Sequence, residues 1–271
     1  MGHQRDNDHE DAHEDFGGLL IDLQLTRSAM SRRTALRTAA SLSALSWLGC
    51  STPTDATDDP STNGTCGKIP SETAGPFPGD GSNGPNVLSQ TGVVRSDIRS
   101  SFAGLSGSAN GVLLNVALTI VSATSCSPLA NRAVYLWHAD ILGRYSLYSA
   151  GVTNQNYLRG VQETDSNGRL NFITIFPGCY DGRWPHIHFE VYPSLAAATN
   201  VANKIATSQI ALPKSACDVV YATTGYAASV SNLSRVSLAT DNVFSDGASL
   251  ELATVTGEVS AGMTATLSVA V

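Results

Sequence analysis

Charged residues are scarce in this chain, and their distribution excludes two classes of partner. Only 14% of the 271 residues are charged, and the formal net charge is -7. Residues 1–29 hold seven acidic residues against Arg5 and Arg27, a balance of -5, so the rest of the chain carries only -2. There is no basic stripe of the kind that nucleic acid or an anionic membrane surface requires. The sequence therefore predicts neither partner.

Cysteines and long apolar runs are also few. The five cysteines include no C-x-x-C pair, so a thiolate zinc site or an iron–sulfur cluster has no support. The apolar segment near the N-terminus is too short for an ordinary transmembrane helix. A 42% hydrophobic content spread over this length is enough for one sizeable core, and abundant Gly, Ser, Thr, Ala and Val favour a sheet protein with many turns.

The segment from Met30 has the layout of an export signal. It reads MSRRTALRTAASLSALSWLGCS, with Arg32 and Arg33 ahead of an uncharged stretch that ends at Cys50. This pattern resembles a twin-arginine signal. We therefore predict a signal peptide over residues 30–50 and an exported protein, periplasmic or extracellular.

The flanks of this signal give further expectations. Residues 1–29 are interpreted as an acidic extension that is not translated if synthesis starts at Met30 rather than Met1. Leu48, Gly49 and Cys50 resemble the end of a lipobox, so a lipid anchor at Cys50 is the one membrane attachment considered. Residues 51–65 have the composition of a flexible tether, and residues 66–271 are predicted to form one folded domain.

The cysteines beyond this leader are even in number. They are Cys66, Cys126, Cys179 and Cys217. In an oxidising compartment this predicts one or two disulfides, with the pairing left open.

Apolar periodicity predicts an all-β fold. VLLNVALTIV at 112–121 and AVYLWH at 133–138 are rich in β-branched and aromatic residues, and a DSNG turn signal precedes RLNFITIF at 169–176. HIHFEVY at 186–192 alternates strictly, and two further strands are expected within 249–259 and 264–271. Short strands without long helical periodicity favour a two-sheet β-sandwich.

Histidine is scarce outside the acidic extension. Of six histidines, only His138, His186 and His188 lie beyond residue 13. His186 and His188 are two positions apart on a predicted strand, so they project to the same face roughly 6.5–7 Å apart at the backbone and can share a metal ion. An isolated His-x-His also occurs as a surface pair or beside a core, so its neighbours matter.

Several ordered motifs around this pair resemble the intradiol ring-cleavage dioxygenases. They are YLWHADILGRYSLY, NYLRGVQETDSNG, FITIFPGCYDGRWPHIHF and TSQI, with SETAGPFP and VVRSDI before them and SDGASLELATVTGEV after them. The resemblance covers about Cys66 to Val271. It implies a β-sandwich in which long loops form the active site.

The resemblance also implies a ligand set and a reaction. In that family two tyrosinates and two histidines hold one non-haem ferric ion, and the matching positions here are Tyr145, Tyr180, His186 and His188. Phenolates are hard anionic donors suited to Fe(III). The implied reaction is intradiol cleavage of a catechol-type diol by O2 to a cis,cis-muconate-type diacid, with Tyr180 as the tyrosinate that the substrate displaces.

Two further residues match active-site positions of that family. Arg183 corresponds to an arginine that stabilises negative charge on the ring, and Gln209 to a glutamine near the iron, although its spacing from His188 is longer than usual. His138 is interpreted as a hydrogen-bonded strand-end residue and Cys179 as buried or disulfide-bonded. Trp137 is assigned to packing, whereas for Trp184 packing and pocket lining are equally supported.

Departures from the family pattern keep alternatives open. Pro78 stands where the entry motif commonly has an aromatic residue. The helical linker that mediates dimerisation in intracellular relatives is absent, so monomer and homodimer are both retained. Bulkier lignin-derived catechols or hydroxyquinol are alternative substrates. A rival from another class is an exported β-sandwich that binds polysaccharide or an aromatic polymer and uses a metal only for structure.

Overall fold

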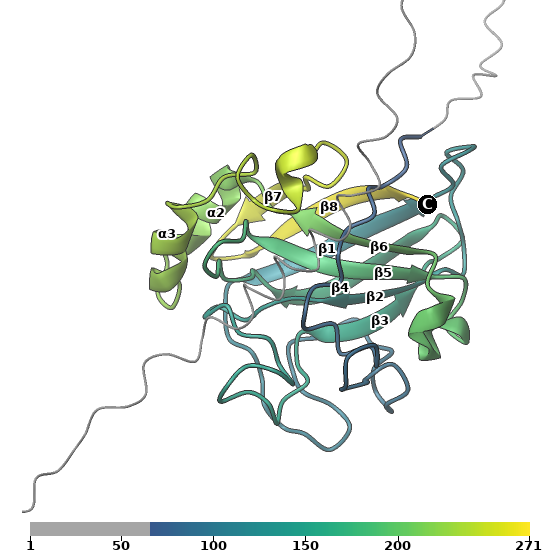
Figure 1. Cartoon of the computed structure of the whole chain (residues 1–271), viewed down its shortest axis with the longest axis horizontal. Helices are drawn as coiled ribbons and strands as arrows, with labels where there is room; N and C mark the ends of the chain where they lie inside the picture. Colours follow the sequence, from purple (N-terminus) through teal and green to yellow (C-terminus); the bar gives the residue numbers. More distant parts are fainter. Residues whose placement is uncertain (1–65) are drawn as a thin grey trace, which may run out of the picture.

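Two four-stranded sheets form the body of the computed structural model (Figure 1). One sheet has the strand order β4-β1-β8-β7 and the other β3-β2-β5-β6. The strands are β1 (Leu113–Val121), β2 (Ala133–Trp137), β3 (Arg159–Glu163), β4 (Arg169–Ile175), β5 (His186–Tyr192), β6 (Ala206–Ala211), β7 (Thr254–Glu258) and β8 (Gly262–Ala270). All neighbouring strands pair antiparallel except β1 and β8, which are parallel.

The structure describes residues 66–271. The predicted acidic extension, signal peptide, lipid-anchor cysteine Cys50 and tether lie outside the described residues and stay predictions. Within the described range, no helix combines the length and apolar character that crossing a bilayer requires.

The main core lies between the two sheets, as the alternating pattern predicts. Along β1 every second residue is buried, from Leu114 to Ile120. These side chains belong to the same apolar cluster as Ile187, Phe189 and Val191 of β5. Burying each such side chain contributes about 1.5–3 kcal/mol. The predicted two-sheet sandwich is confirmed.

Strand β5 is buried on both of its faces. Its inner face joins the main core, and its outer face lies under loops rather than in solvent. A second apolar cluster covers that outer side and includes Tyr135, Trp137 and Tyr192, together with Val87 and Leu88 from the segment before β1. The residues on the outer face of β5 therefore sit in a closed environment although they are outside the sandwich.

The expected strands are present, but the sequence did not predict β3, β6 or the helices. The helical elements are α2 (Lys214–Tyr221), α3 (Ala227–Leu233), η2 (Ala197–Thr199), η3 (Val201–Asn203) and η4 (Phe244–Asp246). Neither α2 nor α3 has an acidic residue in its first turn or a side-chain N-cap, so the usual start signals are missing. The two helices lie together beside one end of the sandwich (Figure 1).

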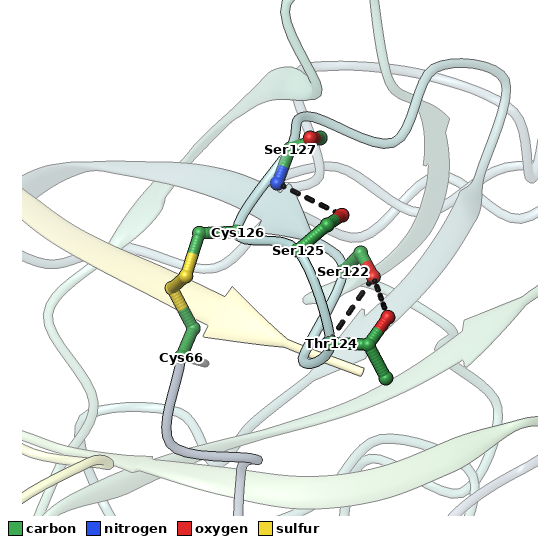
Figure 2. Close-up of a disulfide and its surroundings, with 6 residues drawn as sticks. All are labelled: Cys66, Ser122, Thr124, Ser125, Cys126 and Ser127. Atoms are coloured by element: carbon green, nitrogen blue, oxygen red, sulfur yellow. Dashed lines mark hydrogen bonds between the residues drawn. A yellow bond between two sulfur atoms is a disulfide. The ribbon is translucent and has the colours of Figure 1, made fainter. Parts of the chain in front are cut away.

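One disulfide joins the start of the described chain to the loop after β1. Cys66 and Cys126 are bonded across 60 positions of sequence, as Figure 2 shows. Cys179 and Cys217 are buried free thiols. Of the one or two disulfides expected, the described residues contain one, and Cys179 is buried as predicted.

Removing this disulfide should lower the free energy of unfolding by about 4 kcal/mol, because the bond closes a loop of roughly 60 residues in the unfolded chain. Urea unfolding with and without reductant measures the change. The Cys66→Ser variant is the control, since it should unfold at the same urea concentration in both conditions. An equal reductant effect in that variant would assign the stabilisation to another thiol.

Candidate metal centre

Four side-chain donor atoms converge at the outer face of β5. The Nε2 atoms of His186 and His188 are 3.1 Å apart, and the Tyr145 hydroxyl lies 3.4 Å from the first and 3.2 Å from the second. The Tyr180 hydroxyl lies 3.2 Å from His186 Nε2. Two histidines and two tyrosines from three separate segments therefore point to one place.

These separations fit four ligands of one metal ion. Donors that lie about 2 Å from a shared ion are roughly 3 Å or slightly more from one another. Burial lowers the pKa of both His186 and His188 well below the usual histidine value, and the nearby Arg183 charge acts in the same direction. Both rings are therefore neutral near pH 7 and can offer a lone pair.

The chemistry of the donor set limits which metal it suits. Among residues 66–271 no group of three or more His, Cys, Asp or Glu side chains is arranged to hold a metal. A centre in this part of the chain therefore needs the phenol oxygens of Tyr145 and Tyr180. Two phenolates and two imidazoles suit a hard trivalent ion better than zinc.

Strand pairing orients the histidines. The carbonyl oxygen of Trp184 lies 2.5 Å from His186 Nδ1, so this ring donates there and turns Nε2 toward the site. His188 stands directly opposite Trp137 of β2 and Gln209 of β6. The Trp137 and His188 rings stack with centroids 4.9 Å apart and planes 6° from parallel. His188 Nδ1 is buried without a hydrogen-bond partner, so stacking on Trp137 orients this ring in place of an Nδ1 hydrogen bond.

Glycines let the two tyrosine loops approach closely. Tyr145 belongs to the loop after β2 and Tyr180 to the loop after β4. A Cβ on Gly143 would lie 2.7 Å from Tyr180 Cβ, and one on Gly178 would lie 2.5 Å from the Ile141 carbonyl oxygen. Gly143 also has a φ of 79°, which disfavours other residues. Both positions therefore need glycine for the phenols to meet.

Polar contacts fix the same loops. Asp140 Oδ1 accepts hydrogen bonds from the backbone of Leu142 and Arg144, which shapes the turn before Tyr145. In the other loop, Ser229 and Asn232 of α3 bond the backbone nitrogen and oxygen of Cys179, at 2.9 and 2.7 Å. Helix α3 therefore holds the residue immediately before Tyr180.

Arg183 lies beside these donors and is fully buried. Its Nη1 is 3.5 Å from the Tyr180 hydroxyl, and its Nη2 donates to Gln209 Oε1 at 2.6 Å. Gln209 in turn donates to the Thr73 carbonyl at 3.0 Å. A carboxylate, Asp241, bonds the Arg183 Nε at 3.0 Å. The guanidinium thus faces the site with one edge and Asp241 with another.

A second buried arginine fastens the entry segment, here residues 69–78, to the Tyr145 loop. Arg159 donates to the carbonyls of Phe77 and Pro78 at 2.9 and 2.7 Å, and to the carbonyl and hydroxyl of Ser146, next to Tyr145. Its Nη1 also donates to the Tyr135 hydroxyl at 3.1 Å. The entry segment also bonds β8 and β6 through the backbone of Ile69 and Glu72.

The structure brings all six predicted site residues together. His138 is hydrogen-bonded to Ala139 and Thr174, as interpreted, and burial lowers its pKa to about 4. Glu190 forms an ion pair with Lys204, and the Trp184 indole donates to the Leu212 carbonyl within the main core. Asp241 and Arg159 were not predicted, because a single Asp or Arg in a loop or strand carries no pattern of its own.

Comparison with known proteins identifies the family. A family model described as Dioxygenase matches residues 84–223, more than half of the chain. The chain belongs to the intradiol ring-cleavage dioxygenase family, as its motifs predicted. No curated protein matches it.

Solved structures agree with this assignment. The intradiol ring-cleavage dioxygenase from Tetranychus urticae is 25% identical, with a TM-score of 0.61, and the match covers 76% of this chain and 94% of that one. The dioxygenase Tetur07g02040 is 26% identical, with a TM-score of 0.60 and the same coverage.

The Gly143→Ala variant should weaken metal binding through the Tyr180 loop. Gly151 is the matched control, because it has the same φ of 79° and its added Cβ would meet only the flexible end of Arg144, at 3.7 Å. Both alanines should cost about 1–2 kcal/mol of unfolding free energy for the positive φ. After both variants are loaded with added ferric ion, only Gly143→Ala should lose it on dialysis, and equal retention by both variants would contradict the steric account.

Proposed function

We propose that this chain is a non-haem Fe(III) dioxygenase that cleaves a catechol-type diol with O2 between its two hydroxylated carbons. The product is a cis,cis-muconate-type diacid. Both oxygen atoms enter the product, so the equation balances without an external reductant. The dioxygenase family supports the reaction class, and the donor set supports the metal.

The observation that carries this proposal is the convergence of Tyr145, Tyr180, His186 and His188. These four donors would hold the ferric ion. When bound, that ion binds the two catechol oxygens and gives the ring the electron distribution that permits attack by O2. A purely structural metal would not require two phenolates in a buried site beside a buried arginine.

The two tyrosines have different surroundings, which supports different roles. Tyr145 is only 2% exposed, whereas Tyr180 is partly exposed. We assign Tyr145 to permanent ligation and Tyr180 to displacement by the substrate. Once displaced, the Tyr180 phenolate oxygen can accept a proton from a catechol hydroxyl. Arg183 Nη1, 3.5 Å from this oxygen, favours its anionic form.

Arg183 and Gln209 form the polar wall of the site. The buried guanidinium can stabilise the negative charge that develops on the ring during cleavage. Gln209 Oε1 accepts a hydrogen bond from Arg183 Nη2 at 2.6 Å, which helps to fix the orientation of the guanidinium. We thus assign charge stabilisation to Arg183, in the loop before β5, and the orientation of Arg183 to Gln209 of β6.

The setting of this activity follows from the N-terminal signals. The twin-arginine-type leader expected over residues 30–50 supports an exported enzyme, and the Cys66–Cys126 disulfide is compatible with an oxidising compartment. We propose degradation of aromatic compounds outside the cytoplasm, with catechol, hydroxyquinol and lignin-derived catechols as the substrate candidates.

The proposal is tested by metal content, colour and oxygen uptake. Purified protein should contain one iron per chain and show a visible phenolate-to-iron absorption band that shifts when catechol is added without oxygen. With oxygen, a panel of catechols should give one O2 consumed per ring-opened diacid. A colourless protein without iron that still binds polysaccharide or an aromatic polymer would support the rival binding module.

Substitution of single ligands should abolish both iron and activity. Tyr145→Phe and His188→Ala each remove one of the donors that meet at 3.2 Å. The control is Tyr157→Phe, since Tyr157 contacts Asp140 at 3.3 Å and none of the four donors. The control should keep the visible band and turnover. Full activity in either ligand variant would refute that residue's assignment.

A further inference from the structure

Arg183 forms a buried ion pair with Asp241. The proposed function gives Arg183 a role but gives Asp241 none. Both side chains are completely buried, and Arg183 Nε lies 3.0 Å from Asp241 Oδ2. Asp241 comes from the segment before η4, 58 positions from Arg183. The fold therefore brings a distant carboxylate to the back of the site's arginine.

Backbone donors hold Asp241 itself in place. Its Oδ2 accepts the Trp184 N–H at 2.6 Å, and its Oδ1 accepts the N–H groups of Val243 and Phe244 at 2.8 and 3.1 Å. Both oxygens are thus fixed by main chain rather than by mobile side chains. A carboxylate held in this way gives its partner a fixed point in space.

This fixed point sets the direction of the whole guanidinium. The guanidinium of Arg183 is planar, so the hydrogen bond from Nε to Asp241 restricts where Nη1 and Nη2 lie. Those two nitrogens are the ones that reach the Tyr180 hydroxyl and Gln209 Oε1. Asp241 bonds Arg183, Trp184, Val243 and Phe244 rather than the four donors or Gln209. It acts on them through the Arg183 guanidinium, which contacts both Tyr180 and Gln209.

The same carboxylate also acts on the histidine side of the site. It bonds the N–H of Trp184, and the carbonyl of Trp184 is the group that orients the His186 ring at Nδ1. Asp241 therefore holds both Arg183 and Trp184, and the Trp184 carbonyl orients the His186 ring.

We infer that Asp241 is a positioning residue that acts on ring cleavage through Arg183, by holding the guanidinium against Tyr180 and Gln209. This inference rests on the proposed function. It predicts that loss of the carboxylate charge lowers the turnover per bound iron, and not only the iron content of the protein.

The test compares Asp241→Asn with the unaltered full chain, both loaded with ferric iron. Asparagine keeps the size of the side chain and removes the charge that pairs with Nε. Its oxygen can still accept the Trp184 N–H, and its NH2 then replaces the acceptor of Val243 and Phe244. Turnover per bound iron should fall by ~10- to 100-fold, with KM changed much less, because the loss falls on the transition state. A purely structural role would lower the iron content and leave turnover per bound iron unchanged.

Two controls separate this effect from general damage. Glu190→Gln removes another fully buried carboxylate, paired with Lys204 at 2.7 Å, and should leave turnover per bound iron unaltered. In an Arg183→Gln background, adding Asp241→Asn should change turnover by less than about twofold, because the residue through which it acts is already gone. An unchanged turnover in Asp241→Asn, or the same loss in the Arg183→Gln background, would overturn the inference.

A metal-free readout distinguishes this inference from the proposed function. The Nε–H of Arg183 should give a slowly exchanging nitrogen-15 NMR signal in iron-free protein, identified by its absence in Arg183→Gln and lost in Asp241→Asn. If the unaltered chain neither binds iron nor opens catechols, the proposed function fails, while this signal still reports on the ion pair. Should Asp241→Asn not fold, Asp241→Glu displaces the carboxylate by one methylene and carries the same expectations.

Discussion

The strict alternation of β5 is the constraint on which the site depends. Ile187, Phe189 and Val191 belong to the main core, so the strand cannot slip by one position without turning its apolar side chains out of that core. The same register fixes His186 and His188 on the opposite face. The hydrophobic effect that assembles the sandwich therefore also sets the spacing of the two histidine side chains, without any interaction between the histidines themselves.

The tyrosines reach the site by different means. Their loops have no sheet register. They are held by close approach at Gly143 and Gly178, and by backbone N–H groups that donate to Asp140 and to Ser229 of α3. The site thus combines a rigid half, built on strands, with a half whose geometry depends on many polar contacts. Under the proposed function, this division matches the assignment of Tyr180 to displacement, while the two imidazoles stay in place.

Sequence patterns predicted the strands that carry a clear period of two and the residues that carry motifs. HIHFEVY gave both the strand and its polar face, and family motifs gave the two tyrosines, Arg183 and Gln209. Strand β6 was missed because ATSQIA lacks alternation, and α2 and α3 because they lack capping signals. Asp241 and the choice of Cys126 as the partner of Cys66 depend on contacts between distant segments, which no local pattern encodes.

The entry segment limits where the N-terminal part of this chain can be cut without loss of contacts. Its carbonyls at Thr73, Phe77 and Pro78 satisfy buried N–H groups of Gln209 and Arg159, and the disulfide at Cys66 fastens its beginning. A chain cut anywhere before Cys66 would keep all of these contacts. A cut within residues 69–78 would leave the buried N–H groups of Gln209 and Arg159 without their acceptors.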